Sequence, residues 1–333
     1  MTNLESRIIE RLNPDLSADD CALIEHGGRS YLYTTDSLAE GTHFRLDWSS
    51  PEDIAFKLVQ VNLSDLAAAG GEPEFCLLNL GLPETADEEL IGRFAAALRE
   101  QLSDYRCKLV GGDTFRANGY LFSLTLSGPA LYPRFRRANS NDGIFLSGHV
   151  GMSRLGYEIL NNRKKGEKPV TGETVPLQQF SEQATESGKP VAANGDIEAQ
   201  AIQRHLRPRA NLEAARQINA LQSHSFPVSG AMDLSDGVFA DCQRFAESSG
   251  LNLTVHLEKL PMLQAVAAYG PEFAASSGEE LELLVASSRD LPEGFVRIGE
   301  FEESAQEPVA RFLLNGQEAP SHPGFEHFRE PLQ

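Results

Sequence analysis

Aspartates at the boundaries of apolar segments are the residues in this sequence with the clearest capacity for chemistry. Each alone is typical of a turn or a helix cap. Together they suggest a ligand site, because strand ends meet at crevices, and clustered carboxylates raise one another's pKa unless cations keep them ionised. Oxygen-only ligands favour Mg²⁺ or Mn²⁺. The set is Asp19, Asp20, Asp36, Asp65, Asp113, Asp233 and Asp236.

Small and hydroxyl residues beside these acids suggest that the ligand carries phosphate. Gly111, Gly112 and Gly237 would let backbone N–H groups approach an anion closely, although a tight turn is the alternative at Gly112. The sequence has no Walker A motif, no kinase HRD and DFG pair and no GxGxxG, which disfavours the common nucleotide folds. It also lacks CxxC and HExxH, which disfavours zinc. The neighbouring hydroxyls are those of Thr34, Thr35, Thr114 and Ser235.

The stretch 50–73 predicts the helix that positions Asp65. Ser50 and Asp53 form a capping-box pattern around Pro51, and two glycines end the helix before Pro73. Ile54, Leu58 and Val61 form an apolar stripe. Asn62 and Asp65 share another face, where the carboxylate opposes the helix dipole and calls for a positive partner. A solvated polar patch is the alternative interpretation.

The remaining pattern predicts two domains. Strands at 19–26 and 30–37, 75–83, 106–114 and 120–131, with a helix over 87–105, predict an α+β N-terminal domain at 1–140. The strand at 106–114 is expected to end at its two glycines and Asp113. Strand and helix alternation then predicts an α/β layered C-terminal domain at 141–333, with a helix over 152–160 and a polar insertion at about 161–195.

Bulk composition excludes several function classes. The 333 residues include 48 acids against 29 Lys and Arg, a formal charge of -19 that disfavours nucleic acid and anionic membranes as partners. No apolar run is long enough to span a bilayer, and residues 1–16 predict a short amphipathic helix rather than a signal peptide. Four scattered cysteines indicate reduced thiols and a cytoplasmic location.

The order of the motifs resembles the thiamine-monophosphate kinase family, within the aminoimidazole ribonucleotide synthetase-like superfamily. The resemblance covers nearly the whole chain. It implies that family's two-domain architecture, a homodimer joined through the N-terminal domains, and phosphorylation of thiamine monophosphate by ATP with several Mg²⁺ ions, by direct in-line transfer without a covalent nucleophile. The motifs are DDCAL, TTDSLAEGTHF, VNLSDLAAAGGEP, LVGGDT, HLRPR, AMDLSDG, SSGEELEL and GFEHF.

The resemblance also implies roles for individual residues. The nucleotide would contact Gly112, Asp113, Ser235 and one of three arginines, Arg134, Arg136 or Arg137, of which Arg136 is selected. The thiamine substrate would contact His43 and Glu279, with Phe325 or His322 supplying a stacking surface. The metal ligands would be Asp20, Thr34, Thr35, Asp36, Asp65, Asp113, Asp233 and Asp236.

Three departures from the family pattern leave alternatives open. Both glycines usual before the first Asp pair are replaced in Leu16-Ser17-Ala18-Asp19-Asp20, the usual SGGEDYEL is altered over 276–281, and the insertion has no counterpart. One alternative is a phosphotransferase or ligase of the same superfamily with another small acceptor. The other is a catalytically weak, Mg-nucleotide-binding regulatory protein.

Overall fold

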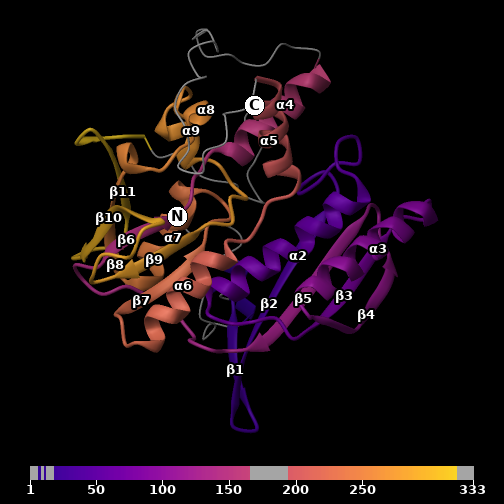
Figure 1. Cartoon of the computed structure of the whole chain (residues 1–333), viewed down its shortest axis with the longest axis horizontal. Helices are drawn as coiled ribbons and strands as arrows, with labels where there is room; N and C mark the ends of the chain where they lie inside the picture. The colour runs from indigo at the N-terminus through magenta and orange to yellow at the C-terminus, as the bar shows by residue number, and fades with distance from the viewer. Residues whose placement is uncertain (1–6, 9–10, 13–18, 166–193, 321–333) are drawn as a thin grey trace.

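A five-stranded sheet forms the N-terminal part of the computed structural model, which describes residues 7–8, 11–12, 19–165 and 194–320. Its strand order is β1-β2-β5-β3-β4, antiparallel throughout except for the parallel pair β3 and β4. Helices α2 and α3 cover one face (Figure 1). The elements are β1 (Ala22–His26), β2 (Arg29–Ala39), α2 (Pro51–Ala68), β3 (Phe75–Leu82), α3 (Glu88–Asp104), β4 (Lys108–Arg116) and β5 (Leu121–Pro129).

A seven-stranded sheet follows, in the order β12-β11-β8-β10-β6-β9-β7. Alternate residues of its central strands enter two separate apolar cores, one on each face. Its elements are β6 (Gly143–Ser147), α4 (Met152–Lys165), α5 (Asn194–Leu206), α6 (Leu212–Ser223), β7 (Val228–Asp233), α7 (Val238–Ser249), β8 (Leu251–His256), η2 (Leu257–Lys259), α8 (Gln264–Ala267), α9 (Pro271–Ala275), β9 (Leu283–Ser287), β10 (Phe295–Glu303), β11 (Ala310–Leu314) and β12 (Gln317–Glu318).

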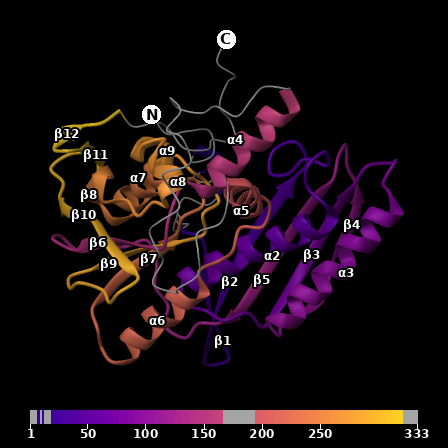
Figure 2. The ribbon, with the colours of Figure 1, turned by 45° about the horizontal axis from the view of Figure 1, so that its top comes forward.

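Helix α2 packs against elements of both halves of the fold (Figure 2). The predicted capping box is present, with the Ser50 side chain accepting a hydrogen bond from the backbone of Asp53. Ile54 and Leu58 are buried against the first sheet, and full burial of one such side chain contributes about 1.5–3 kcal/mol. Val61, the third residue of the predicted stripe, is only partly buried. The last turn of α2 packs instead with α6 and β9.

Most predicted elements are confirmed, including the first two strands, which pair as the β1–β2 hairpin that extends from the body of the protein in Figure 1. Two strand ends were predicted wrongly. Asp36 and Asp113 lie inside their strands, because β2 pairs with β5 as far as Ala39 and β4 pairs with β3 as far as Arg116. Gly112 is therefore not a turn: its φ is +152°, and a Cβ there would lie 1.7 Å from the carbonyl oxygen of Leu78.

The polar insertion begins later than predicted, since α4 continues to Lys165 and α5 begins at Asn194. Residues 166–193 and most of the predicted N-terminal helix lie outside the described residues. The chain passes from the first sheet to the second between β5 and β6. The domain limits at 140 and 141 stay a prediction. Among the described helices, none has the length and apolarity required to cross a bilayer.

Candidate active site

Three aspartates from three different elements meet where the two halves of the fold adjoin. Asp20 precedes β1, Asp65 lies in the second half of α2, and Asp233 is the last residue of β7. Each offers a carboxylate oxygen, and these oxygens lie within 4.8 Å of one another. The fold thus brings together three of the seven acids that the sequence predicted to form one cluster.

The cluster has the electrostatics of a cation site. Burial, followed by the charges of Asp36 and Asp233, raises the pKa of Asp65 well above its ordinary value. Burial and the charge of Asp20 do the same to Asp233. The Thr34 hydroxyl donates a hydrogen bond to Asp65 Oδ2 at 2.7 Å. Asp233 Oδ1 is buried and accepts no hydrogen bond from any described residue. An all-oxygen donor set with an unsatisfied buried oxygen fits a hard divalent cation such as Mg²⁺.

Asp36 lies beside this cluster on β2. Burial and the charges of Asp20, Asp236 and Glu279 raise its pKa to about 6. Its backbone N–H donates to Asn62 Oδ1 at 3.2 Å, so Asn62 of α2 holds the strand that carries Asp36. Asn62 shares a helix face with Asp65, as the sequence predicted, but its amide donates to the Leu58 carbonyl at 2.9 Å and makes no hydrogen bond to Asp65.

The structure separates the three candidate arginines. Arg136 is buried, and its Nη2 lies 3.3 Å from Asp20 Oδ1. Arg134 donates to Asn219, Gln222 and the Ala67 carbonyl, and so joins α2 to α6. Arg137 is exposed. Arg136 is therefore the arginine that lies at the carboxylate cluster.

The DLSDG turn is held by an aspartate that sequence reasoning missed. The backbone N–H groups of Ser235, Asp236 and Gly237 all donate to Asp241 Oδ2, at 3.0, 2.9 and 3.1 Å. Arg244 pairs with both Asp236 and Asp241. The amides offered to a phosphate in the sequence interpretation thus bind an internal carboxylate. An acid in the first turn of the predicted helix was the available signal.

Gly112, Asp113 and Thr35 lie away from the cluster. Asp36 pairs with Leu124, Leu124 with Leu78, and Leu78 with Gly112, which separates Asp36 from Gly112 by three strand spacings, or about 14 Å. Asp113 pairs with Asn79, in the row of the sheet that points away from α2. The Thr35 hydroxyl contacts that of Thr125, also on this open face.

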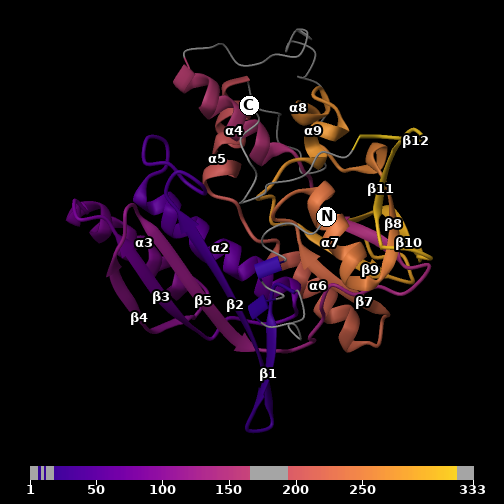
Figure 3. The same cartoon turned by 180° about the vertical axis from the view of Figure 1, so that it is seen from behind.

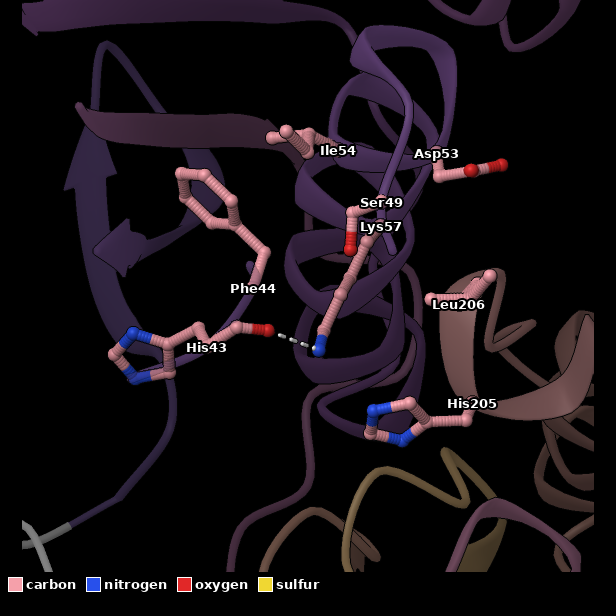
Figure 4. Close-up of a pocket in the computed structure, with 8 residues that line it drawn as sticks. All are labelled: His43, Phe44, Ser49, Asp53, Ile54, Lys57, His205 and Leu206. Carbon is pink, nitrogen blue, oxygen red and sulfur yellow. Dashed lines mark hydrogen bonds between the residues drawn. The ribbon is translucent and has the colours of Figure 1, made fainter. Parts of the chain in front are cut away.

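His43 and Glu279, the predicted substrate residues, are joined by a lysine that sequence reasoning also missed. Lys57 Nζ donates to the His43 carbonyl at 2.7 Å and forms an ion pair with Glu279. His43 and Lys57, together with His205 of α5, line a small pocket between α2 and α5, shown in Figure 4. His205 Nδ1 lies 3.9 Å from Glu279 Oε2, and burial lowers the pKa of this histidine to about 4. The single basic residue of this helix was the available signal.

The altered segment 276–281 has a structural explanation. Glu280 Oε1 accepts the N–H groups of Gly151 at 2.7 Å and Ser153 at 3.1 Å, at the start of α4. Its other oxygen pairs with Arg204 at 3.3 Å. Glu280, where the family usually has Asp, therefore caps a helix rather than facing the pocket. His322 and Phe325, the predicted stacking residues, lie outside the described residues.

Comparisons with known proteins give the family of this chain. Residues 18–130 match the family described as AIR synthase related protein, N-terminal domain. The thiamine-monophosphate kinase of Leptospira interrogans is 39% identical over 335 residues, which is 97% of each chain, and that of Aquifex aeolicus is 31% identical over 90% of this chain and 88% of its own. A solved structure, AaThiL complexed with AMPPCP and TMP, aligns with a TM-score of 0.76 and 28% identity over 98% of this chain and 99% of its own. Identity and coverage of this extent show that the chain belongs to the thiamine-monophosphate kinase family.

Proposed function

We propose that this protein transfers the γ-phosphoryl group of ATP to the phosphate of thiamine monophosphate, giving thiamine diphosphate and ADP. The observation that carries the proposal is the meeting of Asp20, Asp65 and Asp233 in a chain of this family. The related structure in complex with AMPPCP and TMP supports both substrates.

The chemistry requires charge neutralisation more than a nucleophile from the protein. An oxygen of the acceptor phosphate bonds to the γ-phosphorus while the bond to the β–γ bridging oxygen breaks, and the electron pair leaves with ADP. The acceptor is already ionised, so positioning is the main task. Two phosphate charges repel by about 1 kcal/mol at 4 Å in water, and more when dehydrated.

Divalent cations, with Mg²⁺ the natural choice, would be held by the buried acids. Asp20, Asp65 and Asp233 form the core of that site, with Asp36 and Asp236 beside them. Bound there, the cations would neutralise the phosphate charges and hold the reacting groups together. Thr34 fixes the orientation of the Asp65 carboxylate, and Arg136 adds a positive charge next to Asp20.

The proposed substrate pocket lies along the same helix as this cluster, nearer the start of α2. His43 and Glu279 are the proposed contacts for thiamine monophosphate, from the N-terminal and C-terminal halves respectively. His43 Nδ1 accepts the N–H of Ala39 at 3.0 Å, which places the ring proton of the neutral form on Nε2. Glu279 supplies a carboxylate suited to the cationic thiazolium ring. Phe325 and His322 stay predictions for the stacking surface.

A homodimer joined through the first sheet would explain the position of Asp113. Figure 3 shows that sheet from behind, where α2 and α3 lie beyond the strands. This open face and its edge expose Leu77, Val110 and Phe115 by 42, 59 and 44%, an apolar surface suited to a second copy. Asp113 shares the face and lies too far from its own chain's cluster. We therefore assign Gly112 and Asp113 to the nucleotide and metal site of the partner subunit.

The four cysteines are free and buried. Reduced thiols of this kind support a cytoplasmic location for the proposed enzyme.

The test is product analysis after incubation of the pure protein with ATP, Mg²⁺ and thiamine monophosphate. Chromatography is expected to show equal amounts of thiamine diphosphate and ADP, and EDTA is expected to stop the reaction. ATP turnover only with a different acceptor, or nucleotide binding without turnover, would contradict the proposal.

A further inference from the structure

Lys57 is a buried cation placed between the two predicted substrate residues. Its side chain is 4% exposed, and it lies in α2 near apolar residues such as Phe44 and Ile54 (Figure 4). Lysine is almost never buried to this extent unless it is paired. Its Nζ is paired twice, with the Glu279 carboxylate and with the His43 carbonyl oxygen.

Stability alone is a weak reason for this arrangement. Desolvation of a buried ion pair commonly offsets its Coulombic gain, and replacement by an apolar residue of similar size is often neutral or stabilising. The pair also joins segments far apart in the chain, namely the loop of His43, helix α2 and the segment that ends before β9. A functional constraint on the geometry explains Lys57 better than a contribution to folding.

The contacts of Glu279 show what that constraint is. Its backbone N–H donates to the Ser235 carbonyl at 2.6 Å, within the turn that carries Asp233 and Asp236. Its φ of +57° is uncommon for a residue with a side chain, so the backbone is held in place by its surroundings. The main chain of Glu279 is thus tied to the metal-binding turn, while its carboxylate is aimed by Lys57.

Helix α2 carries a residue of the substrate pocket, Lys57, and a residue of the carboxylate cluster, Asp65. Lys57 and Asp65 are eight residues apart in α2, or about 12 Å along the helix axis. Because a helix of this length is rigid and buried here, the distance between the carboxylate cluster and the substrate pocket is set by α2 itself.

We propose that Lys57 is a positioning residue for thiamine monophosphate: it holds the Glu279 carboxylate and the His43 loop in the geometry that receives the thiamine moiety. This inference rests on the proposed function. It extends that function to a residue that contacts His43 and Glu279, the proposed thiamine-binding residues, and not the reacting phosphates. It separates recognition of thiamine from the metal chemistry.

The test compares Lys57→Met, which keeps the length of the side chain without its charge, with Lys57→Arg and with Glu279→Gln. Loss of Lys57 is expected to raise KM for thiamine monophosphate at least tenfold, the equivalent of about 1.4 kcal/mol. KM for ATP and the Mg²⁺ requirement should change less than about twofold, and kcat should fall less than about threefold. Lys57→Arg should recover most of the affinity. The matched control is Arg93→Met in α3, which breaks an exposed ion pair with Glu52 of α2. It should change neither KM nor kcat.

A double variant, Lys57→Met with Glu279→Gln, tests whether Lys57 acts through Glu279. If it does, the double variant binds thiamine monophosphate no worse than the poorer single variant. It also removes both charges, so it stays folded even where Lys57→Met alone leaves an unpaired carboxylate that unfolds the protein. Additive losses, or a rise in KM for ATP equal to that for thiamine monophosphate, would overturn the inference. An unchanged KM for thiamine monophosphate in Lys57→Met would do so as well. Failure of the wild-type protein to form thiamine diphosphate would instead contradict the proposed function.

Discussion

Asp36→Asn tests the electrostatics of the carboxylate cluster by way of stability. In the cation-free protein, burial and neighbouring carboxylates raise the pKa of Asp36 from 3.8 to about 6. Two pKa units correspond to about 3 kcal/mol. Because the pKa of Asp36 is higher in the folded protein than in the unfolded chain, ionisation of Asp36 destabilises the folded state. This destabilisation is absent below pH 3.8 and complete once the pH has risen above about 6. At pH 7.5 in EDTA, the substitution should therefore stabilise the protein by up to about 3 kcal/mol, or raise the unfolding midpoint by roughly 4 °C for a chain of 333 residues.

Added Mg²⁺ should nearly cancel the difference in stability between the two proteins. Ligand binding to the native state at 100 times Kd stabilises it by about 2.7 kcal/mol, a gain that the wild type should show and the variant should largely lose. Thermal unfolding followed by circular dichroism, with and without Mg²⁺, measures both effects. Asp290→Asn is the control, because that side chain is 84% exposed. An Asp36→Asn protein that is less stable than wild type in EDTA, or that gains as much from Mg²⁺, would refute the reasoning.

Three further substitutions address other parts of the site. Asp113→Asn should abolish Mg²⁺-dependent transfer while unfolding stays cooperative; near-normal turnover would remove Asp113 from the site. Asp241→Ala should free the three amides of the DLSDG turn and raise the Mg²⁺ concentration needed for half-maximal rate at least tenfold, about 1.4 kcal/mol, and an unchanged requirement would count against its role. The lowered pKa of His205 makes the wild type lose about 3 kcal/mol of unfolding free energy as the pH falls from 6.5 to about 4, and His205→Gln should remove this loss. Equal losses in both proteins in acid denaturation would contradict this prediction.

Local signals in the sequence were sufficient for much of the fold. The capping box at Ser50 and the first two strands each depend on patterns among neighbouring residues, and both are present. The path of β4 through Gly111 and Gly112 depends instead on pairing with β3, which no local pattern encodes. A glycine required by close approach of another strand therefore resembled a glycine required by a turn.

The candidate site shows the same division. The acids of the cluster were predicted because their positions at element ends are visible in the chain. Lys57 and Asp241 were missed because their roles depend on partners supplied by the tertiary fold, a glutamate from the far end of the chain and the amides of a turn. Strand register alone placed Asp113 on the face away from the cluster, and sequence spacing holds no information about that face.

The most direct test of the central claim is anomalous diffraction from crystals grown with Mn²⁺, a non-hydrolysable ATP analogue and thiamine monophosphate. We predict anomalous peaks about 2.2 Å from carboxylate oxygens of Asp20, Asp65 and Asp233, between the two sets of phosphates. Ordered phosphates with no peak at these three aspartates would contradict the assignment of the cluster as the cation site.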